Sequence, residues 1–159
     1  MYSNKSLKQY LDDLAAKKPA PGGGSAAALV GALAVALLSM VANFTIGKEK
    51  YKVYERDIKN ILKKSQRIRK RLLQLVDLDV QAYMCVVEAR DKSEKHKKIA
   101  LKKAACVPFE VARLCYEAIN LCPTLIKKGN KNLVSDVQVA AEFLLAAFNS
   151  ALINVKINK

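Results

Sequence analysis

An acidic residue interrupts an otherwise apolar helical face in the middle of the chain. Asp79 lies four residues after Leu75 and three after Val76, and Ala82 and Tyr83 follow it at three and four residues. These intervals place its carboxyl group on the core-facing side of a helix. A buried ionised acid is costly unless it is paired or hydrogen-bonded. Asp79 is therefore either a structural hydrogen-bond acceptor or a functional acid that can transfer a proton, and both alternatives stay open.

Three glycines and a serine, residues 22–25, form a second candidate site at the start of a helix. Free backbone N–H groups at a helix N-terminus can bind an anion. The stretch is not a nucleotide-binding loop, because it has neither the GxxxxGK[ST] nor the GxGxxG spacing. The simpler alternative is that Ser25 is the N-cap of the helix and that the glycines allow a tight turn.

A third polar group precedes the last apolar segment. Ser135 is placed as an N-cap, Gln138 completes a capping box with it, and Asp136 stands in the first turn, where the helix dipole favours negative charge. A good helix start requires no chemistry. If this helix pairs with the one that follows the glycines, Ser25 and Asp136 lie near a common cleft, and we adopt that placement as a hypothesis.

The stretch from Ser25 to Gly47 contains no charged residue and is long enough to span a bilayer. It is rich in alanine, it contains Ser39, Asn43 and Thr45, and it begins at a proline-glycine turn rather than an aromatic belt. A helix that is apolar on all sides is more often buried on every side. We therefore expect the central helix of a soluble helical bundle, with no membrane contact.

Periods of three and four residues along the rest of the chain predict an all-α fold in one domain, residues 1–159. Apart from the central helix, we expect helices over 6–17, about 53–90 and 99–105, a helix that starts near Pro108 and is interrupted at Pro123, and one from Ser135. Residues 91–98 should form a polar connector. The predicted buried faces include Leu7, Leu11 and Leu14 near the N-terminus, and Phe143, Ala147, Phe148 and Ala151 in the last helix.

The chain is strongly basic, with 28 Lys and Arg against 14 Asp and Glu and a net charge of +14. Such an excess attracts polyanions, which include nucleic acid, anionic membranes and polyanionic small substrates. The chain has no Trp, and its aromatic residues are scattered, so a stacking platform for nucleic acid is disfavoured. The four cysteines and the single histidine lack metal-ligand spacing. We expect no metal, small buried cysteines and a reducing, cytoplasmic setting.

Four segments occur in an order that resembles a known family: PAPGGGSAAALVGALAVALLSMVANFTIGKEKY, DLDVQAY, VPFEVA and GNKNLVSDVQVAAEFLLAAFNSALINVKIN. They are similar to the cyclodeaminase/cyclohydrolase family of folate enzymes. The resemblance implies an all-helical homodimer that acts on a tetrahydrofolate one-carbon derivative, including polyglutamylated forms. It also implies that no cofactor is needed beyond that substrate. The reaction would be formimino-tetrahydrofolate cyclodeamination or 5,10-methenyltetrahydrofolate cyclohydrolysis.

The resemblance also points to particular residues. For catalysis we select Asp136, Asp79 and Ser135; for substrate binding we select Gly22, Gly23, Gly24, Ser25, Asn43, Asn130 and Asn132. One of the two carboxylates would carry a proton while the other orients the pterin or stabilises its cation. The alternative functions are a non-catalytic helical protein and a basic helical module that binds nucleic acid through residues 56–71.

Overall fold

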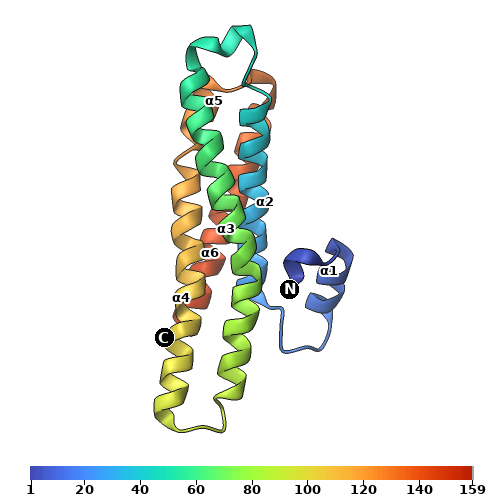
Figure 1. Ribbon diagram of the computed structural model, residues 1–159, viewed down its shortest axis with the longest axis vertical. Helices are drawn as coiled ribbons and strands as arrows, with labels where there is room; N and C mark the ends of the chain where they lie inside the picture. The colour runs from blue at the N-terminus through green and yellow to red at the C-terminus, as the bar shows by residue number, and fades with distance from the viewer. Residues whose placement is uncertain (159) are drawn as a thin grey trace.

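The computed structural model describes residues 1–158 and shows an antiparallel bundle of four long helices (Figure 1). The helices alternate in direction along the chain and are α2 (Gly23–Asn43), α3 (Glu55–Glu88), α4 (Glu94–Ile119) and α6 (Val134–Ile157). α2 packs mainly against α3 and α6, and α4 completes the bundle against the same two helices. The prediction of an all-α bundle is confirmed.

Short elements lie in two groups, one beside the bundle and one at an end of it. The 3-10 turn η1 (Tyr2–Asn4) and helix α1 (Leu7–Ala15) lie beside the bundle near the start of α2. At the opposite end lie η2 (Glu49–Tyr54), α5 (Cys122–Lys128) and η3 (Lys131–Leu133). Each long helix therefore begins or ends in one of these two groups of connections.

Small residues let α2 lie close to its neighbours. Gly31 shows the effect, since a Cβ built there would lie 3.0 Å from Cys115 Sγ and 3.4 Å from Leu72 Cδ1. The facing stripe of α3 is fully or almost fully buried, as its spacing predicts, and contains Ile58, Ile61, Ile68, Leu72, Leu75 and Val76. Burial of each large aliphatic side chain contributes about 1.5–3 kcal/mol to folding.

The prediction that α2 is buried on every side is wrong for one stripe. Leu33 is 50% exposed, and Leu29, Ala36 and Met40 on the same face are only half-buried. By length and composition alone, Gly23–Asn43 and Lys131–Ile157 could each cross a membrane. Most of the apolar window in α2 is nevertheless buried inside the bundle.

Helix α6 and the cysteines also depart from the predicted burial. Ala147 and Ala151 are buried, but Phe143 is 40% exposed, because the buried stripe of α6 passes through Ala140, Leu144 and Ala147 instead. Cys115 and Cys122 are buried, as expected, whereas Cys85 and Cys106 are exposed. In α1, Tyr10 and Asp13 face the protein, which leaves Leu7 and Leu11 exposed.

α4 is one helix, whereas the sequence predicted a connector and two helices. Ser93 is the N-cap residue and Glu94 begins the helix, so the polar connector is shorter than residues 91–98. Pro108 lies inside α4 and is buried. Proline has no N–H to donate, but Pro108 is buried together with Ala104, Val111 and Ala112, and this packing keeps the helix continuous despite that loss. The predicted break at Pro123 is confirmed, because α5 starts at Cys122.

Ion pairs link α3 to α4 and use two arginines of the basic face, residues 56–71, that the nucleic-acid alternative requires. Arg71 Nε and Nη2 donate to the two carboxylate oxygens of Glu110, each over 2.8 Å. Arg67 pairs with Glu117; these residues lie one turn from Arg71 on α3 and about two turns from Glu110 on α4. The bidentate Arg71–Glu110 pair is geometrically specific, and the two ion pairs together link α3 to α4.

At one end of the bundle, the long helices begin and end at different levels. α2 begins at the level of Asp79, since Gly24 lies against that side chain. α3 continues to Glu88, about 14 Å further at 1.5 Å per residue. The α3–α4 hairpin therefore extends beyond the start of α2 (Figure 1). A cavity lies where α2 begins beside the longer helices α3 and α4.

Candidate active site at the start of helix α2

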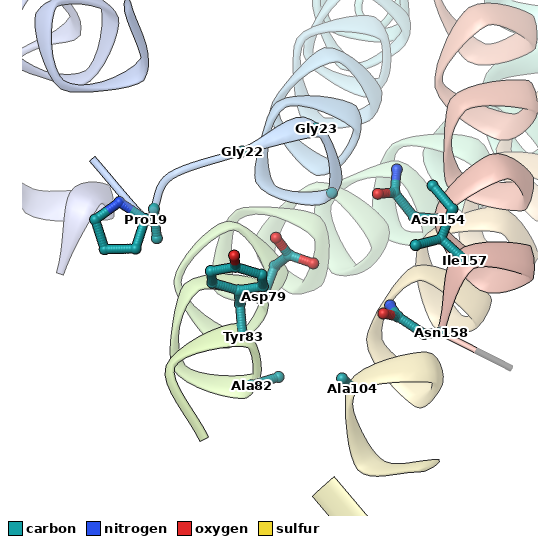
Figure 2. Close-up of a pocket in the computed structure, with 12 residues that line it drawn as sticks. Pro19, Gly22, Gly23, Asp79, Ala82, Tyr83, Ala104, Asn154, Ile157 and Asn158 are labelled. Carbon is teal, nitrogen blue, oxygen red and sulfur yellow. The ribbon is translucent and has the colours of Figure 1, made fainter. Parts of the chain in front are cut away.

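A pocket of about 270 Å³ lies where α2 begins and the α3–α4 hairpin continues past it (Figure 2). Four helices (α2, α3, α4 and α6) and the turn before α2 line it, and the residues involved are Pro19, Ala20, Gly22, Gly23, Gly24, Asp79, Ala82, Tyr83, Ala104, Asn154, Ile157 and Asn158. Among the described residues that line it, Asp79 supplies the one acidic group, and Asn154 and Asn158 add amides. We call this space the glycine-end pocket.

Asp79 supplies the cap that α2 otherwise lacks. The N-cap residue is Gly22, which has no side chain to accept a hydrogen bond. The Asp79 carboxylate from α3 lies against this helix start instead, next to Gly24, where the backbone N–H of Ser25 acts to lower its pKa. The prediction that Ser25 is the N-cap is therefore wrong, because the acceptor comes from a residue distant in the sequence.

Gly24 must lack a side chain for this contact to form. A Cβ at that position would lie 2.6 Å from Asp79 Cγ and would overlap its carboxylate oxygens. At Gly22 a Cβ would meet no atom within 4 Å. Among the predicted glycines, Gly24 is thus the one that determines how closely the carboxylate approaches the helix end.

Burial raises the pKa of Asp79 above its ordinary value of 3.8, and the hydrogen bond from the Ser25 N–H partly opposes that rise. A carboxyl group in this environment exchanges its proton at a higher pH than an exposed aspartate does. That property suits a proton carrier, which works best when its pKa approaches the working pH.

Ser25 connects this pocket to helix α1. Its hydroxyl lies 3.1 Å from the Tyr10 hydroxyl, and both groups are buried. Burial is the main cause of the raised pKa of Tyr10, and the nearby Asp79 charge adds to the rise. Tyr10 therefore stays protonated and holds the Ser25 side chain away from the pocket.

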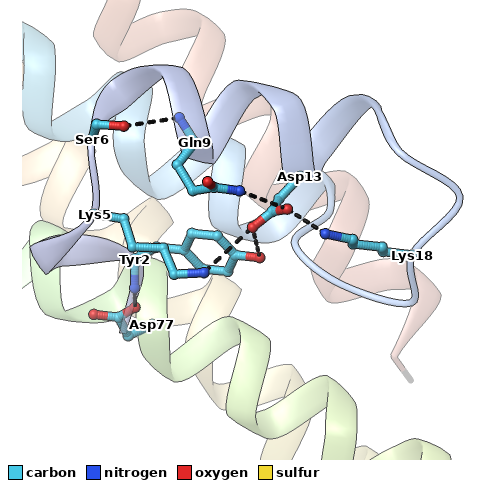
Figure 3. A network of polar contacts seen from close by, with 7 residues as sticks. All are labelled: Tyr2, Lys5, Ser6, Gln9, Asp13, Lys18 and Asp77. Atoms are coloured by element: carbon cyan, nitrogen blue, oxygen red, sulfur yellow. Dashed lines mark hydrogen bonds and ion pairs between the residues drawn. The ribbon is translucent and has the colours of Figure 1, made fainter.

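The N-terminal segment is held in place by two aspartates (Figure 3). Asp77 on α3 accepts hydrogen bonds from the backbone N–H groups of Tyr2 and Ser3. Asp13 accepts from the side chains of Tyr2, Lys5, Gln9 and Lys18. Lys18 directly precedes Pro19 and Ala20 on the pocket wall, so this network positions one side of the pocket.

Five other predicted site residues lie at the opposite end of the bundle. Thr45 Oγ1 accepts a hydrogen bond of 2.9 Å from the Asn130 N–H, and the Asn130 amide donates to the Phe44 carbonyl. Asn43 therefore lies near Asn130 at this end, and the connected segment carries Asn132, Ser135 and Asp136. We call these five residues the asparagine-end group.

The prediction that Ser25 and Asp136 share a cleft is wrong within one chain. α2 and α6 are antiparallel, and Asn154, not Asp136, lies beside Gly23. Asp136 is 18 residues before Asn154 on α6, a separation of about 27 Å along a helix. Ser135 is also not the N-cap, because α6 starts at Val134, and Asn130 caps the preceding turn η3.

Asn154 and Tyr83 line the pocket but were not selected from the sequence. Asn154 had a usable signal, since an amide in an apolar helix is unusual in the same way as Asp79. Tyr83 was assigned to the buried stripe but is 39% exposed beside the pocket. Among residues 1–158, no three His, Cys, Asp or Glu side chains are placed to hold a metal ion.

Comparisons with known proteins identify the family of this chain. Residues 6–159 match the formiminotransferase-cyclodeaminase family model. The chain belongs to this family.

Individual relatives fit that assignment. A methenyltetrahydrofolate cyclohydrolase of Methylorubrum extorquens is 41% identical, over 99% of this chain and 81% of the relative. A formimidoyltransferase-cyclodeaminase of Mus musculus is 31% identical over 96% of this chain, which corresponds to 30% of that longer protein. A crystal structure of a formiminotetrahydrofolate cyclodeaminase from Thermotoga maritima superposes with a TM-score of 0.96 at 39% identity, and covers 99% of this chain and 80% of that one.

Replacement of Gly24 by alanine is expected to destabilise the start of α2, because the new methyl group displaces the Asp79 carboxylate. The loss of an N-terminal helix cap typically lowers the free energy of unfolding by about 1 kcal/mol. Thermal unfolding followed by circular dichroism measures the loss. Gly23→Ala is the matched control, because a Cβ there meets no atom closer than 3.7 Å. It should not lower the melting temperature, and an equal loss in the two variants would contradict this role of Gly24.

The Asp13 network predicts a specific pH dependence of stability. Its partners, Lys18 first, lower the pKa of Asp13 from 3.8 to about 2. A lowered pKa stabilises the fold above the unfolded value, and the contribution disappears as the pH falls through the folded value. The melting temperature of the wild type should therefore exceed that of Asp13→Asn at neutral pH, and the difference should disappear between about pH 4 and pH 2.

Asp12→Asn is the control for this experiment, because Asp12 is exposed and has only an i,i+4 partner, Lys8. It should melt close to the wild type at every pH. A gap between wild type and Asp13→Asn that stays constant down to pH 2 would contradict the assignment.

Proposed function

We propose that this protein is a folate one-carbon enzyme that acts on the carbon bound to N5 or bridging N5 and N10 of tetrahydrofolate. Its reaction is either the hydrolysis of 5,10-methenyltetrahydrofolate or the cyclodeamination of 5-formimino-tetrahydrofolate. Support comes from the family and from the names of relatives that align over nearly the whole chain. The observation that carries the proposal is the Asp79 carboxyl group, held in a pocket with a raised pKa.

One carboxylate serves both reactions. In hydrolysis, Asp79 takes a proton from water as its oxygen bonds to the methenyl carbon. It returns that proton to N5 as the C–N5 bond breaks, and the hydroxyl proton leaves to solvent as the formyl group forms. In cyclodeamination, N10 attacks the formimino carbon, and Asp79 moves the N10 proton to the departing nitrogen, which leaves as ammonia. Such positioned proton transfer contributes about 10²–10⁴-fold.

The charge of the pocket fits the charge of the reacting group. The methenyl bridge and the protonated formimino group are cations, and Asp79 is the one acidic residue that lines the glycine-end pocket. An anion near a cationic centre stabilises it most where water is excluded. We assign Asn154 and the backbone around Gly23 to hold the pterin ring by hydrogen bonds.

A homodimer would bring the two ends of the bundle together. The half-exposed stripe on α2 borders a groove of about 510 Å³ shared with Leu73 of α3. Leu33, at its centre, lies ten residues from each end of α2. A two-fold axis beside Leu33 would place the glycine end of one subunit against the asparagine end of the other. We propose this arrangement, in which Asp136 reaches the pocket of the partner subunit.

Asp79→Asn is expected to lower kcat by about 10²–10⁴-fold, while the fold is retained because the asparagine oxygen still accepts from the Ser25 N–H. Conversion of methenyl- and formimino-tetrahydrofolate is followed separately by near-ultraviolet absorbance. The wild-type pH–rate profile should show an acidic limb above the ordinary aspartate range that the variant lacks. Near-normal turnover in the variant would reject Asp79 as the proton carrier.

Subunit mixing tests whether Asp79 and Asp136 of one site come from different chains. Asp79→Asn and Asp136→Asn should each be nearly inactive. After both are mixed and allowed to exchange subunits, about one quarter of wild-type activity should return, because half of the dimers then carry one intact site. No recovery, with exchange confirmed by mass spectrometry, would contradict the shared site.

Leu33→Asp tests the interface itself. It should convert the dimer to monomers in sedimentation velocity, because an uncompensated charge is buried at the centre of the stripe. Tyr116→Asp, at an exposed position on α4, is the control and should leave the dimer intact. A wild-type protein that sediments as a monomer at micromolar concentration would contradict the dimer.

A further inference from the structure

A second groove runs beside the glycine-end pocket, between α4 and the end of α6. Its volume is about 600 Å³. One face of α4 supplies most of its lining at helical spacing, with Lys98, Leu101, Lys102, Ala105, Cys106 and Phe109, and the end of α6 adds Val155 and Asn158. The groove therefore has an apolar floor and two lysines, and we call it the α4 groove.

The pocket and the α4 groove adjoin one another. Asn158 lines both cavities. On α4, Ala104 lines the pocket while its neighbour Ala105 lines the groove. Figure 2 shows Ala104 and Asn158 side by side at the edge of the pocket nearest α4. A ligand that leaves the pocket along α4 thus enters this groove.

The size of the pocket requires such an exit if the substrate is a folate. A volume of 270 Å³ is below the range of about 300–1,000 Å³ typical of sites that enclose a drug-sized ligand. It can hold a pterin ring, but not the p-aminobenzoyl ring and glutamate that folates also carry. These parts must lie on an adjoining surface.

The charges of the α4 groove match that remaining part of the molecule. Within residues 1–158, Lys98 and Lys102 take part in no ion pair, and no acidic residue lines the groove. By contrast, Lys97 on another side of α4 is paired with Glu94. Leu101, Ala105 and Phe109 offer apolar contact for an aromatic ring. Two free ammonium groups beside an apolar floor are suited to an aryl amide that ends in carboxylates.

We propose that the α4 groove binds the p-aminobenzoyl-glutamate part of the folate substrate, with Lys98 and Lys102 pairing with its glutamate carboxylates. The inference rests on the proposed function, because it assigns the half of the substrate that the pocket cannot hold. From Ala104 to Lys98 the helix rises about 9 Å, which lets the two lysines meet successive carboxylates of a glutamate chain. Additional glutamates should therefore increase affinity.

Kinetics with three substrates test the proposal: 5,10-methenyltetrahydropteroate, which lacks glutamate, and the mono- and triglutamates of 5,10-methenyltetrahydrofolate. In the double variant Lys98→Gln/Lys102→Gln, KM for the triglutamate should rise about 5- to 20-fold, as expected for the loss of two solvent-exposed ion pairs. KM for the pteroate and kcat for all three substrates should stay within about twofold of wild type.

The matched control is Lys63→Gln/Lys64→Gln, which removes the same charge from exposed positions on α3 that line neither cavity. It should leave every KM unchanged. An equal rise in KM for both double variants would mean long-range attraction by net charge and would overturn the groove assignment. An unchanged triglutamate KM in Lys98→Gln/Lys102→Gln would overturn it as well, while the proposed function would stand. No wild-type turnover of either the methenyl or the formimino substrate would instead overturn the proposed function.

Thiol protection gives a readout independent of turnover. Cys106 lies in the groove and is exposed, and Cys85 on α3 is exposed but lines neither cavity. Burial raises the pKa of Cys115 to about 12 and that of Cys122 to about 11, so both should react slowly. Saturating tetrahydrofolate triglutamate should slow iodoacetamide labelling of Cys106 at least fivefold and leave Cys85 unaffected. Equal labelling of Cys106 with and without the triglutamate would contradict the proposal.

Discussion

The contact between the Asp79 carboxylate and the start of α2 is the interaction on which the site depends. It places an acceptor at a helix start that has no side-chain cap of its own, and it holds the carboxyl group at the edge of a pocket. Two effects act on that group in opposite directions. Burial favours its protonated form, whereas the N–H donor at the helix end favours the carboxylate. A group balanced in this way can bind a proton and release it, so the same contact serves both folding and the proposed chemistry.

The pocket itself forms because the four long helices do not all extend to the same level. α2 begins, and α6 ends, where α3 and α4 continue, so side chains of the longer pair face space that no helix fills. Asp79, Ala82 and Ala104 line that space, and the turn before α2 closes one side with Pro19 and Ala20. The N-terminal network around Asp13 then holds this turn against the bundle. The long α3–α4 hairpin also creates the adjoining groove, and for this reason we treat both cavities as one binding surface.

The helices and much of the core could be predicted from the sequence because these features depend on local periodicity. The α3 stripe from Ile58 to Val76 and the position of Asp79 within it are examples. The cap of α2 could not be predicted, because its acceptor comes from another helix more than 50 residues away in the sequence. The predicted start of a separate helix near Pro108 was wrong for a similar reason, since tertiary packing maintains α4 across a residue that usually ends a helix. The selected site residues divide between the two ends of the bundle, because sequence spacing does not show whether neighbouring helices run in the same direction.

The role of Asp79 as a proton carrier can be tested by a carboxyl ¹³C NMR titration, with its resonance assigned by comparison with Asp79→Asn. We expect a midpoint clearly above the ordinary aspartate value of 3.8. We also expect the resonance to shift when a tetrahydrofolate derivative binds. A midpoint at or below 3.8, or a resonance unaffected by saturating folate, would show that Asp79 only caps α2 and would contradict its role as the proton carrier.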